Sequence, residues 1–218
     1  MNSESRPPQQ ARSRRTLERL LSAAVALMEE EGLAGVTIPV VAARAGVSTG
    51  SIYRRFVDKD ALVRAAFLRF LEASRIANRE SLTPERFAGM SLERVSRAVC
   101  RGLVRQFRSH PRLLKALDQF LDVQTDAAFR EQAISTVADN TRLVVELLLP
   151  FRDRIASGDP ERAITFALLS AITVIEMHAL HSAALWTRML PLEDEALADE
   201  AARAMAAYLT SPDMEGPD

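Results

Sequence analysis

The chain has 218 residues, a formal net charge of −1, and 48% hydrophobic residues. This length suits one or two modest domains, and the apolar content suffices for a buried core, which excludes a disordered or fibrous protein. The near-neutral charge by itself indicates nothing about a nucleic-acid partner. The single cysteine, Cys100, excludes an intrachain disulfide. It fits a reducing compartment, so we expect a cytoplasmic protein.

The sequence shows no pattern expected of a signal peptide or of a membrane span. The N-terminus lacks the apolar stretch of a signal peptide. The longest apolar run, around residues 163–185, is interrupted by polar residues and falls short of the roughly 18–20 residues of a membrane span. We therefore expect no membrane partner. Polar, proline-containing residues 1–11 and residues 211–218 are expected to be disordered.

Charge is distributed unevenly along the chain. Residues 1–21 carry five arginines against two glutamates, whereas the rest is balanced or slightly acidic. A basic end on a neutral body is typical of a protein with one DNA-binding face. No segment shows sustained alternation of apolar and polar residues, so we predict an all-α protein of about nine helices.

The first predicted helix covers residues 13–31 and ends at Gly32. A helix-turn-helix motif follows over residues 37–56. Thr37 caps its first helix, whose apolar face consists of Ile38, Val41, Ala42 and Ala45. A left-handed C-terminal residue is least strained as glycine, so Gly46 ends that helix, and Ser48 caps the next one.

The second helix of this motif has an inner and an outer side. Val47, Ile52 and Phe56 point inward and hold the two helices together. The residues left on the outer side are Thr49, Gly50, Ser51, Tyr53 and Arg54. A helix held in this way, with its first turn exposed, enters the major groove of duplex DNA. The pattern therefore predicts a DNA-binding domain over residues 13–58.

Residues 13–75 resemble the DNA-binding domain of the tetracycline-repressor (TetR) family of bacterial transcriptional regulators. The resemblance rests on the following residues: Gly32, Thr37, Val41-Ala42, Ala45-Gly46-Val47-Ser48, Gly50-Ser51-Ile52-Tyr53, Phe56 and Lys59-Asp60-Ala61-Leu62. Two positions depart from the family pattern: Arg55 stands where His or Tyr is frequent, and Pro39 where a polar residue is frequent. Beyond residue 80 the resemblance is architectural only. It implies a helical body that dimerises and binds a small molecule, whose identity does not transfer.

The remaining predicted helices follow in chain order. A connecting helix, capped by Asp58, covers residues 59–80. The body, residues 81–210, opens after Thr83-Pro84 or after Ser91, and its first helix is broken at His110-Pro111. Further helices cover residues 111–122, 125–149, 160–185 and 193–209. The helix from 160 is apolar almost all round and that from 193 is alanine-rich, which favours a two-fold interface between these helices of two copies over packing within one chain.

Each predicted DNA contact has a chemical reason. The hydroxyls of Thr49 and Ser51 can bind several base edges, and Gly50 lets the backbone approach the duplex. Arg44 either reads a base, contacts a phosphate or is solvated. The N-terminal arginines form either an arm reaching the duplex or a solvated tail. The residues expected to contact DNA are Thr37, Arg44, Ser48, Thr49, Gly50, Ser51, Tyr53, Arg54, Arg55, Lys59, Arg12, Arg14 and Arg15.

The predicted effector pocket is mostly apolar with a few polar groups. Its aromatic members are equally well explained as core, and Glu176 more readily pairs with an arginine than with a ligand. The candidate lining residues are Phe107, Phe120, Phe129, Thr136, Asn140, Thr173, Glu176, Met177 and Trp186. His178 and His181 lack a third ligand, so we expect no metal and no cofactor. Cys100 is interpreted as a core residue, not as a redox sensor.

The sequence therefore indicates a homodimeric transcriptional repressor that binds a pseudo-palindromic operator and is released by a small, mostly apolar effector. An effector-independent DNA-binding regulator or an activator is the alternative. A helical enzyme is the remote one, because the sequence shows no nucleophile–base pair, no paired carboxylates and no metal motif.

Overall fold

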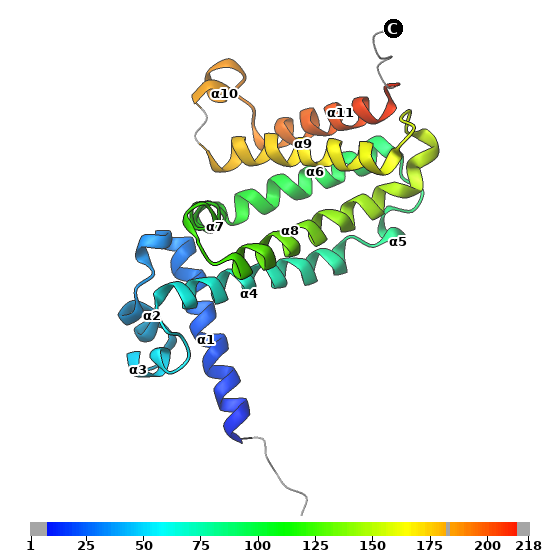
Figure 1. Ribbon diagram of the computed structural model, residues 1–218. Helices are drawn as coiled ribbons and strands as arrows, with labels where there is room; N and C mark the ends of the chain where they lie inside the picture. The colour runs from blue at the N-terminus through cyan, green and yellow to red at the C-terminus, as the bar shows by residue number, and fades with distance from the viewer. Residues whose placement is uncertain (1–7, 182–183, 213–218) are drawn as a thin grey trace, which may run out of the picture. The chain divides into compact units, whose positions relative to one another are not determined.

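The computed structural model describes residues 8–181 and 184–212, which form helices and no strand (Figure 1). The prediction of an all-α fold is thus confirmed for these residues. The α-helices are α1 (Pro8–Glu31), α2 (Ile38–Ala45), α3 (Thr49–Tyr53), α4 (Lys59–Ser81), α5 (Pro84–Phe87), α6 (Leu92–Ser109), α7 (Pro111–Val123), α8 (Ala127–Leu148), α9 (Pro160–Leu180), α10 (Ala184–Met189) and α11 (Asp194–Thr210). Two 3-10 segments, η1 (Leu33–Gly35) and η2 (Leu149–Arg154), complete the order.

Capping residues fix many of these helix ends. The Asp58 carboxylate accepts a hydrogen bond from the Ala61 amide at 2.7 Å, which begins α4 as predicted. Asp159 accepts from the Arg162 amide at 3.1 Å and begins α9, with Pro160 in its first turn. Thr83-Pro84 and Ser91, the two alternative starts of the body, both begin a helix: α5 follows the first and α6 the second.

Three segments differ from the sequence predictions. The expectation of disorder is wrong for residues 8–11, because α1 begins at Pro8; residues 1–7 and 213–218 lie outside the described residues. The apolar helix from residue 160 ends at Leu180 instead of near 185, and the short α10 follows it. His181 has an extended backbone (φ −108°, ψ 129°), which interrupts the helix that the apolar composition alone predicts to continue.

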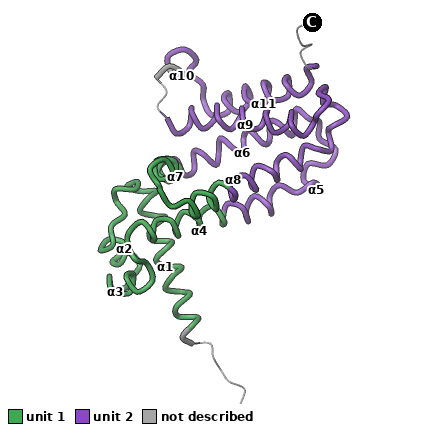
Figure 2. The backbone as a smooth tube through the Cα atoms, in the orientation of Figure 1, with its two compact units in different colours: residues 1–73, 112–134 green, residues 74–111, 135–218 purple. Residues whose placement is uncertain are grey.

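The chain divides into two compact units (Figure 2). Unit 1 contains residues 1–73 and 112–134, and unit 2 contains residues 74–111 and 135–218. Helices α4 and α8 each begin in unit 1 and end in unit 2. The division differs from a contiguous body over residues 81–210, because the apolar face of α7 packs in the core of unit 1.

The core of unit 1 joins the motif helices to residues far along the chain. Leu20, Met28 and Ile52 are fully buried there, together with Phe67 of α4. The ring of Phe67 lies 5.5 Å from that of Phe120 on α7 (centroid to centroid). Phe120 in turn meets Phe129 of α8 edge-on at 5.7 Å. Such aromatic pairs add about 0.5–1.5 kcal/mol beyond the burial of their area.

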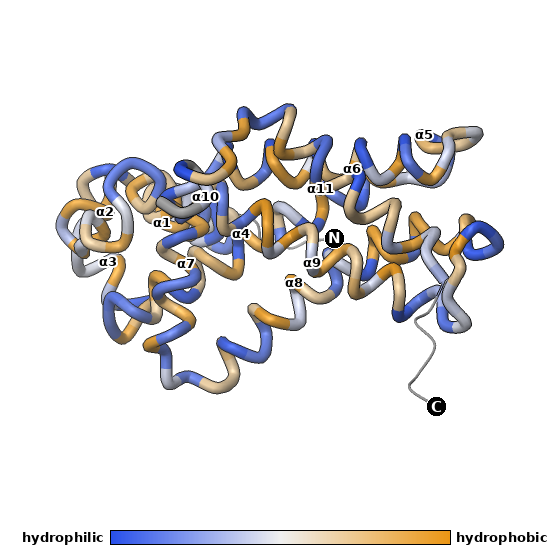
Figure 3. The backbone as a smooth tube through the Cα atoms, turned by 90° about the horizontal axis from the view of Figure 1, so that it is seen from above, coloured by the Kyte–Doolittle hydropathy of each residue, from blue (hydrophilic) through white to orange (hydrophobic). Residues whose placement is uncertain are grey.

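The core of unit 2 is built mainly by α6, α9 and α11, which pack against one another. Leu92, Ile175 and Leu197 are buried where these helices meet, and Cys100 is buried among them. In the hydropathy view, hydrophobic residues recur along the helices between hydrophilic ones (Figure 3), as expected for helices with one face in a core.

Helix α9 is, contrary to the sequence expectation, long and apolar enough to cross a membrane by length and composition alone (mean hydropathy 1.8). A core helix of a soluble protein passes the same test, so one such helix is weak evidence for a membrane span. Its packing against α6 and α11 accounts for the apolar residues on its buried side.

Candidate nucleic-acid interface

The two motif helices have the caps that the sequence predicts. The Thr37 hydroxyl accepts a hydrogen bond from the Val40 amide at 3.4 Å at the start of α2. Gly46 adopts the left-handed conformation (φ 63°, ψ 42°) and ends that helix, which a residue with a Cβ does only under strain. The Ser48 hydroxyl accepts from the Ser51 amide at 3.3 Å and begins α3. Ile52 and Phe56 are buried, so the register of α3 is fixed by its inner side.

The first turn of α3 is open to solvent. Thr49 and Gly50 are exposed, and a Cβ built at Gly50 meets only the Ser48 hydroxyl, at 4.0 Å. Tyr53 is 59% exposed, which favours a phosphate contact for its hydroxyl over a core role. The leading turn thus exposes Thr49 and the side-chain-free Gly50, as a helix that enters a major groove requires.

Cations flank this turn. The Arg54 guanidinium donates to the Ser51 hydroxyl at 2.9 Å, and the Arg55 guanidinium donates to the Ser13 hydroxyl on α1 at 2.8 Å. The Lys59 ammonium, in the first turn of α4, donates to the carbonyl of Leu33 at 3.4 Å. These bonds orient the basic groups of the exposed Arg54 and of the half-buried Arg55 and Lys59, whose phosphate contacts stay a prediction.

Arg44 is held by a residue that the sequence analysis did not single out. Its guanidinium forms a two-pronged ion pair with the Glu30 carboxylate near the end of α1, with one nitrogen–oxygen distance of 2.6 Å. The hydrogen bond from Arg44 lowers the pKa of Glu30, and the same bond raises the pKa of Arg44. The Arg112 guanidinium of α7 donates to the backbone carbonyl of Glu30. Arg44 is therefore held in one orientation by Glu30, and a contact between Arg44 and a base stays a prediction.

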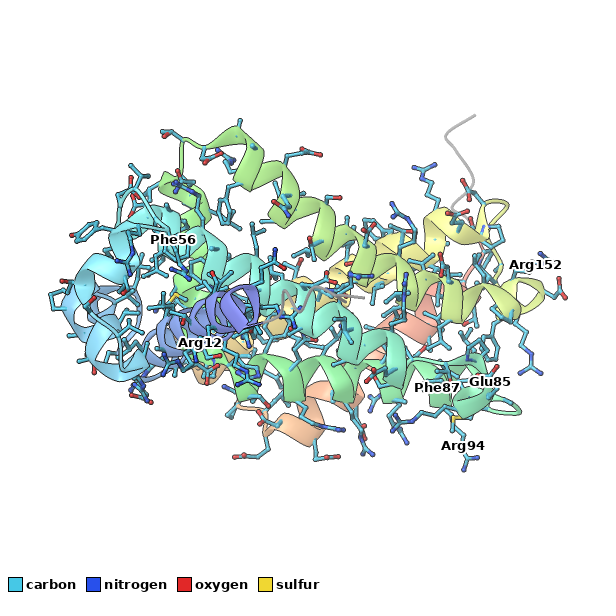
Figure 4. The ribbon with its side chains drawn as sticks, turned by 90° about the horizontal axis from the view of Figure 1, so that it is seen from below. Arg12, Phe56, Glu85, Phe87, Arg94 and Arg152 are labelled. Atoms are coloured by element: carbon cyan, nitrogen blue, oxygen red, sulfur yellow. The ribbon has the colours of Figure 1, made fainter. Side chains whose placement is uncertain are left out.

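The N-terminal arginines belong to a helix instead of an extended arm. Arg12, Arg14 and Arg15 lie in α1 and are exposed (Figure 4 labels Arg12). The Arg12 carbonyl accepts a hydrogen bond from the Thr16 hydroxyl at 2.9 Å, so this stretch is bonded as helix.

The nine residues of the predicted effector pocket fall into both units. Phe120 and Phe129 are core residues of unit 1, with 4% of each exposed. The other seven belong to unit 2: Phe107, Thr136, Asn140, Thr173, Glu176, Met177 and Trp186. Phe107 packs against the core of unit 2, whereas Trp186 lines a hollow between α9, α10 and α11.

Two polar members of that set have informative surroundings. The amide oxygen of Asn140 is buried and accepts no hydrogen bond from the described residues. The hydroxyl of Thr173 donates to the Leu169 carbonyl at 3.0 Å, which satisfies it within α9.

The histidine that was weighed as a metal ligand has other neighbours. His178 lies 3.3 Å from the Arg108 guanidinium, and its ring meets that of Trp186 in an edge-to-face arrangement. Among residues 8–181 and 184–212, no group of three or more His, Cys, Asp or Glu residues is placed to hold a metal ion.

The geometry defines a class of protein: a helix-turn-helix protein whose second motif helix, α3, has a capped and solvent-exposed first turn. Residues 20–66 match the family model described as bacterial regulatory proteins, tetR family. No curated protein matches the chain. Residues 20–66 thus form a TetR-type DNA-binding domain, as the motif residues indicate.

Solved structures with this fold cover most of the chain. A putative TetR-family regulator from Mesorhizobium loti aligns with a TM-score of 0.66 at 20% identity, over 91% of this chain and 96% of that one. The regulator FadR from Bacillus subtilis, in complex with stearoyl-CoA, gives 0.61 at 14%, over 88% and 97%. RolR in complex with resorcinol gives 0.53 at 24%, over 89% and 96%. The chain therefore has the fold of a TetR-like transcriptional regulator.

Proposed function

We propose that this protein is a homodimeric transcriptional repressor that binds a pseudo-palindromic operator through α3 and is released by a small effector. The observation that carries the proposal is the capped, solvent-facing first turn of α3, with Gly50 leaving room for a duplex. One copy of so short a helix contacts few base pairs, so tight binding needs two copies at fixed spacing.

An exposed apolar face on α9 and α11 supports the dimer. Phe166, Leu169 and Met177 lie on α9 three and then eight residues apart, which places them on one side of the helix, and each is at least 42% exposed. On α11, Tyr208 is 46% exposed and its ring lies 5.2 Å from that of Phe166. Monomeric proteins rarely expose contiguous apolar surface of this kind. A second copy packed by its own α9 and α11 covers it.

A hollow in unit 2 supports an effector site. We call it the effector hollow: it measures about 340 Å³ and lies between the second half of α4, α6 and α8. Leu82, Val99, Leu103 and Val144 give it apolar walls, and Asn78 is one of its polar groups. Asn140, with its unpartnered amide oxygen, lies one turn before Val144 on the same side of α8. None of the nine predicted pocket residues lines this hollow, although it has the predicted mixture of apolar walls and few polar groups.

Helix α4 offers a route by which effector binding changes operator affinity. The helix begins at Lys59, beside the recognition helix, and its last turns carry Asn78 and Ser81 of the effector hollow. An effector shifts the equilibrium between two conformations only as far as it prefers one of them. If the ligand prefers the conformation that binds DNA weakly, it lowers the affinity for the operator. By linkage, bound operator must lower the affinity for the ligand by the same factor.

Selection of operators from a random duplex library, followed by footprinting, tests the proposal. We expect protection of two half-sites whose centres lie one or more helical turns apart, with affinity falling steeply as salt increases. No protection at low salt, or protection of a single isolated half-site, contradicts it. Sedimentation of the DNA-free protein should show a dimer.

A further inference from the structure

Beside the effector hollow lies a surface groove with an unusual concentration of arginine. This basic groove measures about 520 Å³ and lies between the end of α4, α5 and α6. Its charged lining residues are Arg86, Arg94, Arg97, Arg101 and Arg105, and no carboxylate lines it. In a chain whose formal charge is −1, five lining guanidiniums are a local excess that the overall composition does not explain.

The spacing of four of these arginines follows the helix. Arg94, Arg97, Arg101 and Arg105 are separated by three, four and four residues, which places them along one side of α6. Ala98 and Gly102 lie between them and form a low floor. A Cβ built at Gly102 meets nothing within 4 Å, so the space above the floor is open. The groove is therefore a channel with cationic sides, wide enough for a ligand group to lie along the helix.

Carboxylates of α11 compensate only part of this charge. Arg97 pairs with Asp199 at 3.2 Å, and Arg101 pairs with Glu195 at 2.6 Å. The Glu93 carboxylate, next to Arg94 in sequence, lines a different hollow and is hydrogen-bonded by the Ser91 side chain. The Arg86 guanidinium donates to the Ser81 carbonyl, a neutral partner, at 3.3 Å. Most of the positive charge thus remains available to an anion.

The basic groove adjoins the effector hollow. The two share Ser81, Leu82, Ala98, Gly102 and Arg105, so a ligand can occupy both. Phe87 and Met90 add apolar surface to the groove itself, and Figure 4 shows Phe87 and Arg94 near each other at this end of the molecule. One continuous site thus offers cations at one end and apolar walls at the other.

We propose that the effector is an amphipathic phosphate compound, whose di- or polyphosphate group binds the arginines of the basic groove and whose apolar chain fills the effector hollow. The inference rests on the proposed effector site and names its ligand class. Planar guanidinium groups match phosphate oxygens two at a time. A single carboxylate satisfies one guanidinium group, whereas a diphosphate supplies enough oxygens for several, which suits a groove lined by five arginines.

Isothermal titration of the full-length protein with three compounds tests this inference. The probes are geranyl diphosphate, geraniol, which has the same chain without charge, and inorganic diphosphate, which has the charge without the chain. We expect geranyl diphosphate to bind at least about tenfold more tightly than either, because only it uses both parts of the site. Equal affinity for geraniol and geranyl diphosphate overturns the proposal.

A matched pair of variants locates the phosphate group. The double variant Arg94→Gln/Arg105→Gln removes two exposed groove cations, and Arg152→Gln/Arg162→Gln removes two exposed cations of the same unit outside the groove. The first should weaken binding of geranyl diphosphate by about tenfold or more, since each lost guanidinium removes charge-assisted hydrogen bonds. It should change geraniol binding much less, because of the two arginines only Arg105 also lines the effector hollow. The second should change neither, and circular dichroism should show both folded. Equal losses in the two variants overturn the proposal.

Two further outcomes separate this inference from the proposed function. The titrations contain no DNA, so geranyl diphosphate binding that depends on Arg94 and Arg105 supports the ligand class even if no operator is found. Operator binding without any response to the three probes overturns the ligand class and leaves the DNA-binding function standing. A non-operator duplex can also be tested as a competitor of geranyl diphosphate. If the duplex displaces the compound from the unaltered protein but not from Arg94→Gln/Arg105→Gln, the groove binds nucleic acid and the proposal is overturned.

Discussion

Replacing Gly50 with glutamate separates DNA docking from folding. Gly50 is the second residue of α3, and the only atom that a Cβ there approaches is the Ser48 hydroxyl, at 4.0 Å. The new side chain therefore fits. A residue other than glycine in a helix adds about 0.5–1 kcal/mol of stability. An acidic group in the first turn adds about 0.3–1 kcal/mol through the helix dipole. The free energy of unfolding should stay constant or increase by up to about 2 kcal/mol.

Operator binding should respond in the opposite direction. The carboxylate lies on the turn that we propose faces the duplex, and a like charge placed against a partner costs several kcal/mol. A loss of about 3 kcal/mol corresponds to a reduction in affinity of roughly 100-fold. Fluorescence anisotropy with a selected operator measures the affinity, and thermal unfolding followed by circular dichroism measures the stability.

Gly158→Glu is the matched control. Gly158 precedes α9 in unit 2, and a Cβ built there meets nothing within 4 Å. This variant carries the same added charge and should bind the operator like the unaltered protein. Operator affinity of Gly50→Glu within about threefold of the unaltered protein, a difference well under 1.4 kcal/mol, refutes docking through this turn.

Three further predictions test other parts of the structure. Tyr53→Ala should lower the affinity for all duplexes equally, whereas Arg44→Ala should also relax the preference at one base pair. Competition with single-base operator variants distinguishes the two outcomes. Burial raises the pKa of Cys100 from 9.0 to about 12, so its contribution to stability is complete below pH 9.0 and is lost as pH rises toward 12. The native thiol should therefore react with a disulfide reagent at pH 8 only after denaturation, and fast native reaction contradicts its burial. Phe166→Arg should yield monomers in sedimentation, and Val123→Arg, at an exposed position of unit 1, should not; a dimeric Phe166→Arg variant excludes the α9 face.

The local features of the fold were predictable because short-range chemistry determines them. The caps Thr37, Ser48 and Asp58 lie where hydroxyl and carboxylate side chains precede apolar periodicity, and each begins a helix. Gly46 required a left-handed position and adopts one. The exposure of the first turn of α3 followed from the inward positions of Ile52 and Phe56, which a helical period of 3.6 residues fixes.

The long-range features were not predictable in the same way. The apolar stripe of α7 indicates that Phe120 is buried but not in which unit. Periodicity shows which side of a helix is buried, but not which residues cover that side. Likewise, no local rule pairs Arg44 with Glu30, fourteen residues earlier. The arginine stripe on α6 carried a readable signal in its spacing, yet arginine predominates over lysine throughout the chain, and this bias concealed it.

The composition of unit 1 constrains how hybrid regulators can be assembled from this chain. The backbone leaves that unit after residue 73 and returns for residues 112–134, so its hydrophobic interior is finished only when Phe120 and Phe129 join Phe67. A fusion that transplants residues 1–73 onto a foreign sensor leaves one side of that interior bare. Recombination that exchanges operator specificity must instead either carry both segments or alter only the outward residues of α3.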